Sequence, residues 1–215
     1  MSDLRVVASV TPTRHTSDGN WINARGLRDG SIVMADLLMA LAAEGRVFAA
    51  NQGTVTTPIA TAATTAIVAA RPMAWVRVPD ATAIIPIYQS LVVESTGATT
   101  QGEIAMGFTQ NDVGNGTSTA GGTPVNLNAS NPLTSNCTTR RLATADVTAE
   151  TNLVELTRYS FAASAVDQRF VWNVLDSGVF PILRGGATWL NYIGGNAVNF
   201  YITQVWAELP ENFFS

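Results

Sequence analysis

The feature that most constrains the fold of this chain is a set of short segments in which apolar and polar side chains alternate. The clearest segment spans residues 198–207 and contains two contrasting sets of side chains. The first set is Val198, Phe200, Ile202, Gln204 and Trp206, and the second is Asn199, Tyr201, Thr203, Val205 and Ala207. Because successive side chains of a strand point to opposite faces, this segment predicts a β-strand with one face in a core.

Similar patterns between turns rich in Gly, Pro, Asn and Ser predict further strands. The predicted strands cover residues 46–50, 73–78, 82–94, 103–109, 155–163, 169–175 and 179–183. Residues 54–70, rich in Thr, Pro and Ala, predict extended chain or strands buried on both faces. Trp189 and Tyr192 precede the last strand beside Gly194 and Gly195, and we assign them to no strand.

The segment 82–94 is apolar on both faces, which predicts a central or interface strand. Pro86 within it cannot donate to a ladder, so it indicates an edge or a bulge. The turn over residues 96–101 leads into the strand 103–109, and the pair predicts a hairpin. Glu94 and Glu103 would face each other across that hairpin. Carboxylate pairs of this kind arise by chance in strand-rich chains, so we do not interpret them as a glycosidase pair.

One helix is predicted over residues 31–44. Ser31 is a suitable N-cap, apolar side chains follow at helical spacing, and Gly45 stands where a left-handed C-cap would end the helix. The spaced apolar residues are Met34, Leu37, Leu38 and Leu41. Residues 1–30, with a long polar stretch, are predicted to form an extended N-terminal arm.

Together these elements predict an all-β fold, because alternating β–α units are missing. Eight to ten short strands and one short α-helix are typical of a two-sheet β-sandwich or jelly roll. We therefore expect an arm over residues 1–30 and a single sandwich domain over residues 31–215. No repeat with a period of about 20 to 50 residues is present.

The composition indicates a surface suited to contact. Hydrophobic residues make up 47% and charged residues 13% of the chain. All 12 basic residues are arginine, which excludes mechanisms that need a lysine amine and favours interfaces, although base composition of the genome explains this equally well.

The net charge is −4 and no basic run occurs, so no nucleic-acid partner is expected. No signal peptide or membrane span is predicted, and we expect synthesis in a cytoplasm.

The residue types that carry chemistry are scarce. His15 is the only histidine and lies in the polar N-terminal segment, so catalysis by a Ser–His or Cys–His pair is not predicted. Cys137 is the only cysteine and has no basic partner nearby in the sequence, which indicates a buried, unreactive thiol. We therefore predict no catalytic, cofactor-binding or metal-binding residues, and expect that the chain is not an enzyme.

The predicted loop over residues 110–132 contains an oxygen-rich segment. Its polar residues Asn111, Asp112 and Asn115, with Gly114 and Gly116, partly match a calcium loop. The alternating spacing and the terminal bidentate Glu of such loops are missing, so we interpret the segment as an Asn-Gly turn.

The five tryptophans allow two interpretations: a stacking platform for sugars, or the core and subunit contacts. They are Trp21, Trp75, Trp172, Trp189 and Trp206. Four of them lie in or beside apolar strand patterns, which favours the core or an interface.

Three segments resemble virion structural proteins of tailed bacteriophages, and most of all jelly-roll capsid decoration, or cement, proteins. They are residues 45–51 (Gly-Arg-Val-Phe-Ala-Ala-Asn), 75–80 (Trp-Val-Arg-Val-Pro-Asp) and 204–210 (Gln-Val-Trp-Ala-Glu-Leu-Pro). The resemblance implies a homotrimer or other homo-oligomer that binds the lattice of the major capsid protein and reinforces it. It also implies a virion location after synthesis in the host cytoplasm, without nucleic-acid or membrane partners. The alternative hypothesis is a carbohydrate-binding jelly-roll module of a fibre or adhesin.

Overall fold

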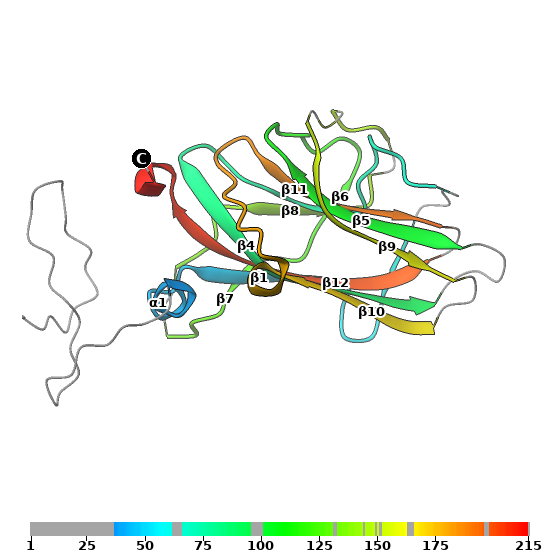
Figure 1. Cartoon of the computed structure of the whole chain (residues 1–215), viewed down its shortest axis with the longest axis horizontal. Helices are drawn as coiled ribbons and strands as arrows, with labels where there is room; N and C mark the ends of the chain where they lie inside the picture. Colours follow the sequence, from blue (N-terminus) through cyan, green and yellow to red (C-terminus); the bar gives the residue numbers. More distant parts are fainter. Residues whose placement is uncertain are drawn as a thin grey trace, which may run out of the picture.

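The computed structural model describes residues 37–61, 66–95, 101–130, 133–143, 145–148, 150, 152–162, 166–195 and 198–214. Over these residues the chain folds into two six-stranded antiparallel sheets that pack face to face (Figure 1). The predicted all-β sandwich is therefore confirmed. The predicted arm over residues 1–30 lies outside the described residues. No described helix is long and apolar enough to cross a membrane.

Sheet 1 has the strand order β10–β4–β12–β1–β7, with β2 also paired to β12. Its strands are β1 (Val47–Gln52), β2 (Ile59–Ala60), β4 (Thr82–Ser95), β7 (Val125–Asn126), β10 (Val166–Asn173) and β12 (Asn199–Pro210). Sheet 2 has the order β6–β8–β3–β11–β5–β9. Its strands are β3 (Ala74–Arg77), β5 (Gly102–Thr109), β6 (Thr119–Ala120), β8 (Thr138–Arg141), β9 (Val154–Phe161) and β11 (Thr188–Gly194).

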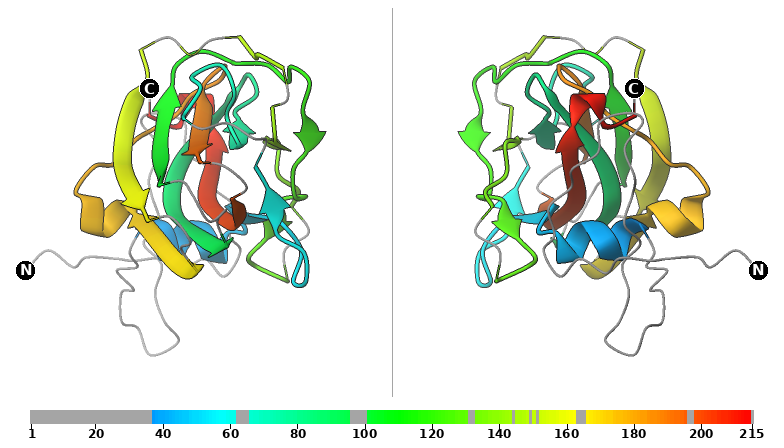
Figure 2. Two further views of the ribbon diagram at one scale, coloured as in Figure 1. Left: turned by 90° about the vertical axis from the view of Figure 1, so that its right-hand side faces the viewer. Right: turned by 90° about the vertical axis from the view of Figure 1, so that its left-hand side faces the viewer.

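The connections cross repeatedly from one sheet to the other, as in a jelly roll. The strands β3, β4 and β5 alternate between the sheets, and the steps from β9 to β10 and from β11 to β12 also change sheet. The end-on views of Figure 2 show the two layers side by side. The predicted hairpin between residues 82–94 and 103–109 is therefore wrong. β4 lies between β10 and β12, and both of its edges are taken by strands much later in the chain.

The centre of sheet 1 is the pair of long strands β4 and β12. Their register shifts between Val205 and Trp206, which face Tyr88 and Pro86, so that Ile87 is the extra residue of a bulge. The bulge predicted at Pro86 is thus confirmed, as is the central position of this strand. The strand predicted over residues 179–183 is wrong, because only a single bridge from Leu183 to Ile84 joins that segment to a strand.

Two α-helices and one 3-10 helix complete the described fold. The helix α1 (Leu37–Ala43) ends before Gly45, whose φ of 71° confirms the predicted left-handed cap; the predicted start at Ser31 lies outside the described residues. The short helix α2 (Val174–Ser177) begins after β10 because the Asn173 side chain accepts a hydrogen bond from the Asp176 amide. The strand predicted over residues 169–175 therefore ends at Asn173. The 3-10 helix η1 (Glu211–Phe214) follows β12.

The core between the sheets consists of two apolar clusters separated by carboxamides. Trp172, Trp189 and Trp206 belong to one cluster, and Phe161 and Phe200 to the other. Along β4, β11 and β12, the position between the two clusters is occupied by a fully buried carboxamide, and these three are Gln89, Asn191 and Gln204. The Gln89 side chain donates to Asn191 Oδ1, and Gln204 Nε2 donates to Gln89 Oε1 at 3.5 Å. A polar layer thus joins the two sheets at mid-core.

Candidate functional site

The outer face of sheet 2 is covered by the chain itself, and we call it the covered face. Trp75 and Leu190 are completely buried there. Loop residues Val113, Ala143 and Val147 pack over them. The loop is also bonded to the strands, because Trp75 Nε1 donates to the carbonyl oxygen of Gly114 at 3.2 Å. This face has no apolar surface left for a partner at these positions.

An ion pair holds the same loop at its edge. Arg77 Nε donates to Asp112 Oδ1 at 2.7 Å, and Arg77 Nη1 donates to Asn115 Oδ1 at 2.5 Å. Arg140 Nε donates to the same Asn115 oxygen at 3.0 Å. The hydrogen bond from Arg77 lowers the pKa of Asp112 below its ordinary value, against the opposing effect of partial burial. Asp112 therefore stays ionised and anchors the loop.

These contacts explain the oxygen-rich segment noted in the sequence. Its carboxylate and one of its amides are bonded to arginines, and both glycines have left-handed backbone angles, with φ of 73° at Gly114 and 48° at Gly116. The predicted Asn-Gly turn is not found, because residues 112–116 form no hydrogen-bonded backbone turn, and the Gly114 amide instead donates to Asp112 Oδ1 at 2.8 Å. Within the part of the chain that the structure describes, no group of three or more His, Cys, Asp and Glu side chains could hold a metal ion.

The outer face of sheet 1 is covered only at one end. There α1 and η1 lie over it, and Leu41 packs with Ile85 and Ala207. Beyond this end, no described helix or strand packs on the face, although Gly53 of the loop after β1 lies against the Tyr201 ring, and we call that part the open face. Because strand side chains alternate, the register assigns it Ala49, Asn51, Tyr88, Ser90, Val92, Glu94, Asp167, Arg169, Val171, Tyr201, Thr203 and Val205. Of these, Val205 borders the covered end, because it packs against the cluster that contains Leu41.

The open face combines apolar and neutral polar groups with few charges. Its two tyrosines are half-buried and each is oriented by a charged neighbour. Arg169 Nη2 donates to the Tyr88 hydroxyl at 2.5 Å, and the Tyr201 hydroxyl donates to Glu94 Oε1 at 3.4 Å. Tyrosine and arginine are enriched in protein interfaces, where lysine and glutamate are depleted. The arrangement is chemically suited to binding another protein surface.

Most residues singled out in the sequence lie away from the open face. Cys137 is buried, as predicted, and burial together with nearby Glu208 raises the pKa of its thiol. Glu94 and Glu103 lie in different sheets, so the predicted pairing across a hairpin is wrong. Glu103 instead accepts from Arg158 Nη1 at 2.8 Å. His15 and Trp21 lie outside the described residues.

The remaining tryptophans are core residues. Trp75, Trp189 and Trp206 have no exposed surface and Trp172 is 4% exposed, which confirms the interpretation that they fill the interior. The residues that sequence reasoning missed are Tyr88 and Arg169, which form the bonded pair on the open face. Their signal is the alternation along β4 and β10, which places Tyr88 and Arg169 on the face opposite the core set, although both faces of β4 are largely apolar. Comparisons with protein families, with curated proteins and with solved structures found no match for this chain.

Proposed function

We propose that this protein is a non-enzymatic structural protein of a virion that assembles with copies of itself through the open face and reinforces a capsid by binding its lattice. The observation that carries the proposal is the contrast between the two outer faces. One is buried under loops of the same chain, whereas the other leaves Tyr88, Val92 and Tyr201 half-buried with no described helix or strand over them. A second copy would complete the burial of these side chains.

The charges on the open face favour a contact between copies. Arg169 and Asp167 lie on β10 and Glu94 on β4, so the face carries one positive and two negative groups. Two such faces, suitably rotated, place opposite charges together, and this complementarity guides the orientation of association. The surrounding Val and Ala side chains have no polar group that would lose its bound water on burial.

The capsid lattice is proposed on the resemblance to decoration proteins and on general energetics. A repeated lattice offers many equivalent sites, so an oligomer that binds several at once gains strength without a large single interface. The low charge of the chain is compatible with this kind of binding. The glycan-binding alternative has lost a main support, because four of the five tryptophans are buried and supply no stacking platform for a sugar.

The assembly is tested by light scattering on the full chain after size-exclusion chromatography. We expect a homo-oligomer that dissociates in Thr203→Arg, because the substitution places an additional charge in the middle of the open face. The matched control is Ser160→Arg on the exposed surface of β9, which should leave the mass unchanged. A monomer for the unsubstituted chain would overturn the proposal. Particle location is tested by immunogold labelling of purified virions, which should decorate the capsid shell.

A further inference from the structure

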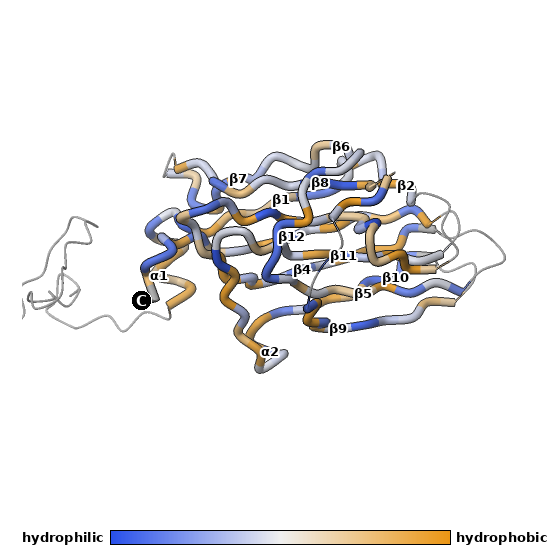
Figure 3. Tube along the Cα trace, turned by 90° about the horizontal axis from the view of Figure 1, so that it is seen from above, coloured by the Kyte–Doolittle hydropathy of each residue, from blue (hydrophilic) through white to orange (hydrophobic). Residues whose placement is uncertain are grey.

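Exposed apolar side chains gather at the end of the molecule that carries α1. They are Leu37, Met39, Val125, Leu127 and Leu133, and we call them the end patch. Their exposed fractions lie between 44% and 69%, which is unusual for large aliphatic side chains in one region. Figures 1 and 3 place α1 and β7 at this same end.

The loop that carries three of these side chains is bonded firmly to the end of α1. Asn126 Nδ2 donates to the carbonyl oxygen of Gly45 at 2.8 Å and to that of Leu133 at 3.0 Å. Asn128 Nδ2 donates to the carbonyl oxygen of Ala43 at 2.9 Å. These bonds fix the loop to the helix, so the apolar side chains are held outward by a defined structure.

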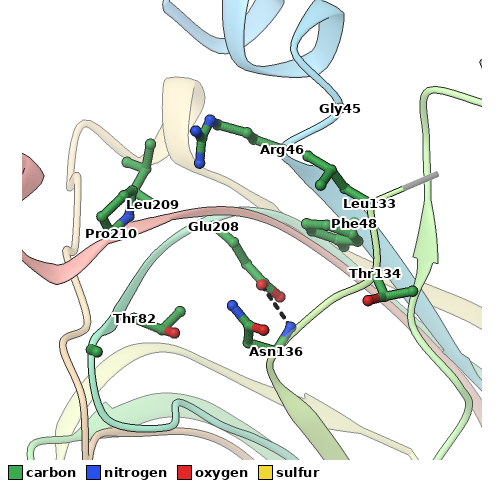
Figure 4. Close-up of a pocket in the computed structure, with 11 residues that line it drawn as sticks. Gly45, Arg46, Phe48, Thr82, Leu133, Thr134, Asn136, Glu208, Leu209 and Pro210 are labelled. Atoms are coloured by element: carbon green, nitrogen blue, oxygen red, sulfur yellow. Dashed lines mark hydrogen bonds between the residues drawn. The ribbon is translucent and has the colours of Figure 1, made fainter. Parts of the chain in front are cut away.

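A hollow of about 230 Å³ adjoins the end patch, and Leu133 forms part of its wall (Figure 4). Phe48 and Leu209 supply apolar lining, and Asn136 and Glu208 supply polar lining. The Glu208 carboxylate is held in place, because it accepts hydrogen bonds from the Asn136 amide at 2.9 Å and from a tryptophan indole. A mixed lining of this kind suits an extended peptide, whose side chains are apolar and whose backbone is polar.

We infer that the end patch and this hollow bind residues 4–10 of a neighbouring copy. These residues include Leu4, Val6, Val7 and Val10. They precede α1 by 26 residues, 11–36, and a chain of that length spans at most about 90 Å when fully extended, so its length allows it to reach an adjacent domain. Leu37, where the described structure begins, is itself part of the end patch.

The position of α1 is the reason for choosing a neighbouring copy. This helix covers one end of the outer face of sheet 1, and the rest of that face is the proposed interface between copies. Helix α1 is therefore close to the proposed interface, where an adjacent copy would lie. The inference therefore rests on the proposed function in one respect, because it needs a neighbouring copy at the open face.

Cross-linking between two variants that each carry one added cysteine tests the inference. We would co-express tagged Val7→Cys chains with untagged Leu127→Cys chains and treat the purified assembly with a short bismaleimide. The native Cys137 is buried with a raised thiol pKa, so it competes little. We expect a cross-linked dimer that contains one chain of each kind. Replacing Leu127→Cys by Val154→Cys, at an equally exposed apolar position on β9, should abolish that dimer.

The outcomes separate this inference from the proposed function. An oligomer by light scattering that gives no mixed cross-link overturns the inference and leaves the proposed assembly standing. A cross-link formed only within one chain, in a Val7→Cys and Leu127→Cys double variant, also overturns it. A monomeric chain by light scattering would overturn both the inference and the proposed assembly. A second readout is hydrogen exchange in the full chain: Val7→Asp should speed exchange of the amides in residues 125–130 several-fold without changing exchange in β11.

Discussion

The outer faces of the two sheets have similar backbones, but one is covered by loops of the same chain and the other is covered at one end only. On sheet 2, Trp75 and Leu190 are sealed under loops that cross back over the strands, and an Arg77–Asp112 pair fixes one of those loops. On sheet 1, α1 covers only one end, and Tyr88 and Tyr201 remain half-buried. A face closed by its own chain contributes to folding, whereas a face left open is available for association. The same strand architecture thus serves stability on one side and, in the proposed assembly, contact on the other.

The largest expected effect is on the covered face. Trp75→Ala should lower the free energy of unfolding by about 3–5 kcal/mol, because it removes a fully buried ring and leaves a cavity. Equilibrium urea denaturation measures the change. Trp75→Phe serves as the control, since it keeps most of the buried area and loses the bond to Gly114. A loss below about 1 kcal/mol for Trp75→Ala would show that the loops do not seal this face.

A matched pair of Thr→Val substitutions compares the faces directly. Thr188 on the covered face is fully buried; its hydroxyl donates to the Asn111 carbonyl oxygen at 3.0 Å and accepts from the Val113 amide at 3.3 Å. Thr188→Val should cost about 1–3 kcal/mol, because it leaves buried partners unpaired. Thr203→Val on the open face should change the stability of the dissociated chain by less than about 0.5 kcal/mol. Equal losses at the two positions, measured by urea denaturation at low protein concentration, would contradict the distinction between the faces.

The smallest destabilisation expected on the covered face is at its edge. Arg77→Gln should cost about 1 kcal/mol or less, because Asp112 is 40% exposed and its ion pair is partly screened. The lowered pKa of Asp112 means that its contribution is present above the ordinary carboxyl pKa of about 4 and is lost as the pH falls through the folded value. Stability measured between about pH 5 and pH 2 should therefore fall less steeply in Arg77→Gln than in the unsubstituted chain. Parallel profiles would show that the pair has no role.

The sequence was informative about strands and less so about their partners. Alternation in residues 198–207 identified β12, and Gly45 identified the end of α1, because both depend on local geometry. The hairpin prediction failed because a turn joins strands in sequence without placing them in one sheet. β11 was missed because all seven of its residues are buried: when both faces are covered, a strand has no polar face and no alternation.

The candidate site could be anticipated only in part. The low charge and lack of lysine indicated a surface suited to contact, and the second set of positions in β12 included Tyr201, Thr203 and Val205. Nothing in a single strand pattern indicates which face the later loops will cover. That outcome depends on contacts such as Trp75 with Gly114 and Arg77 with Asp112, which join residues 35 to 39 positions apart.

The carboxamide layer at mid-core has a consequence for the alignment of the two sheets. If sheet 1 slid along sheet 2 by two residues, Gln89 and Gln204 would face Trp189 or Ile193, and Asn191 would face aliphatic side chains. Each carboxamide left without a hydrogen-bond partner in this way would lower the stability of the fold by about 1–3 kcal/mol. A core made only of Val, Ile and Leu carries no such penalty for sliding. The three carboxamides therefore favour the observed alignment of the two sheets over alignments shifted by two residues.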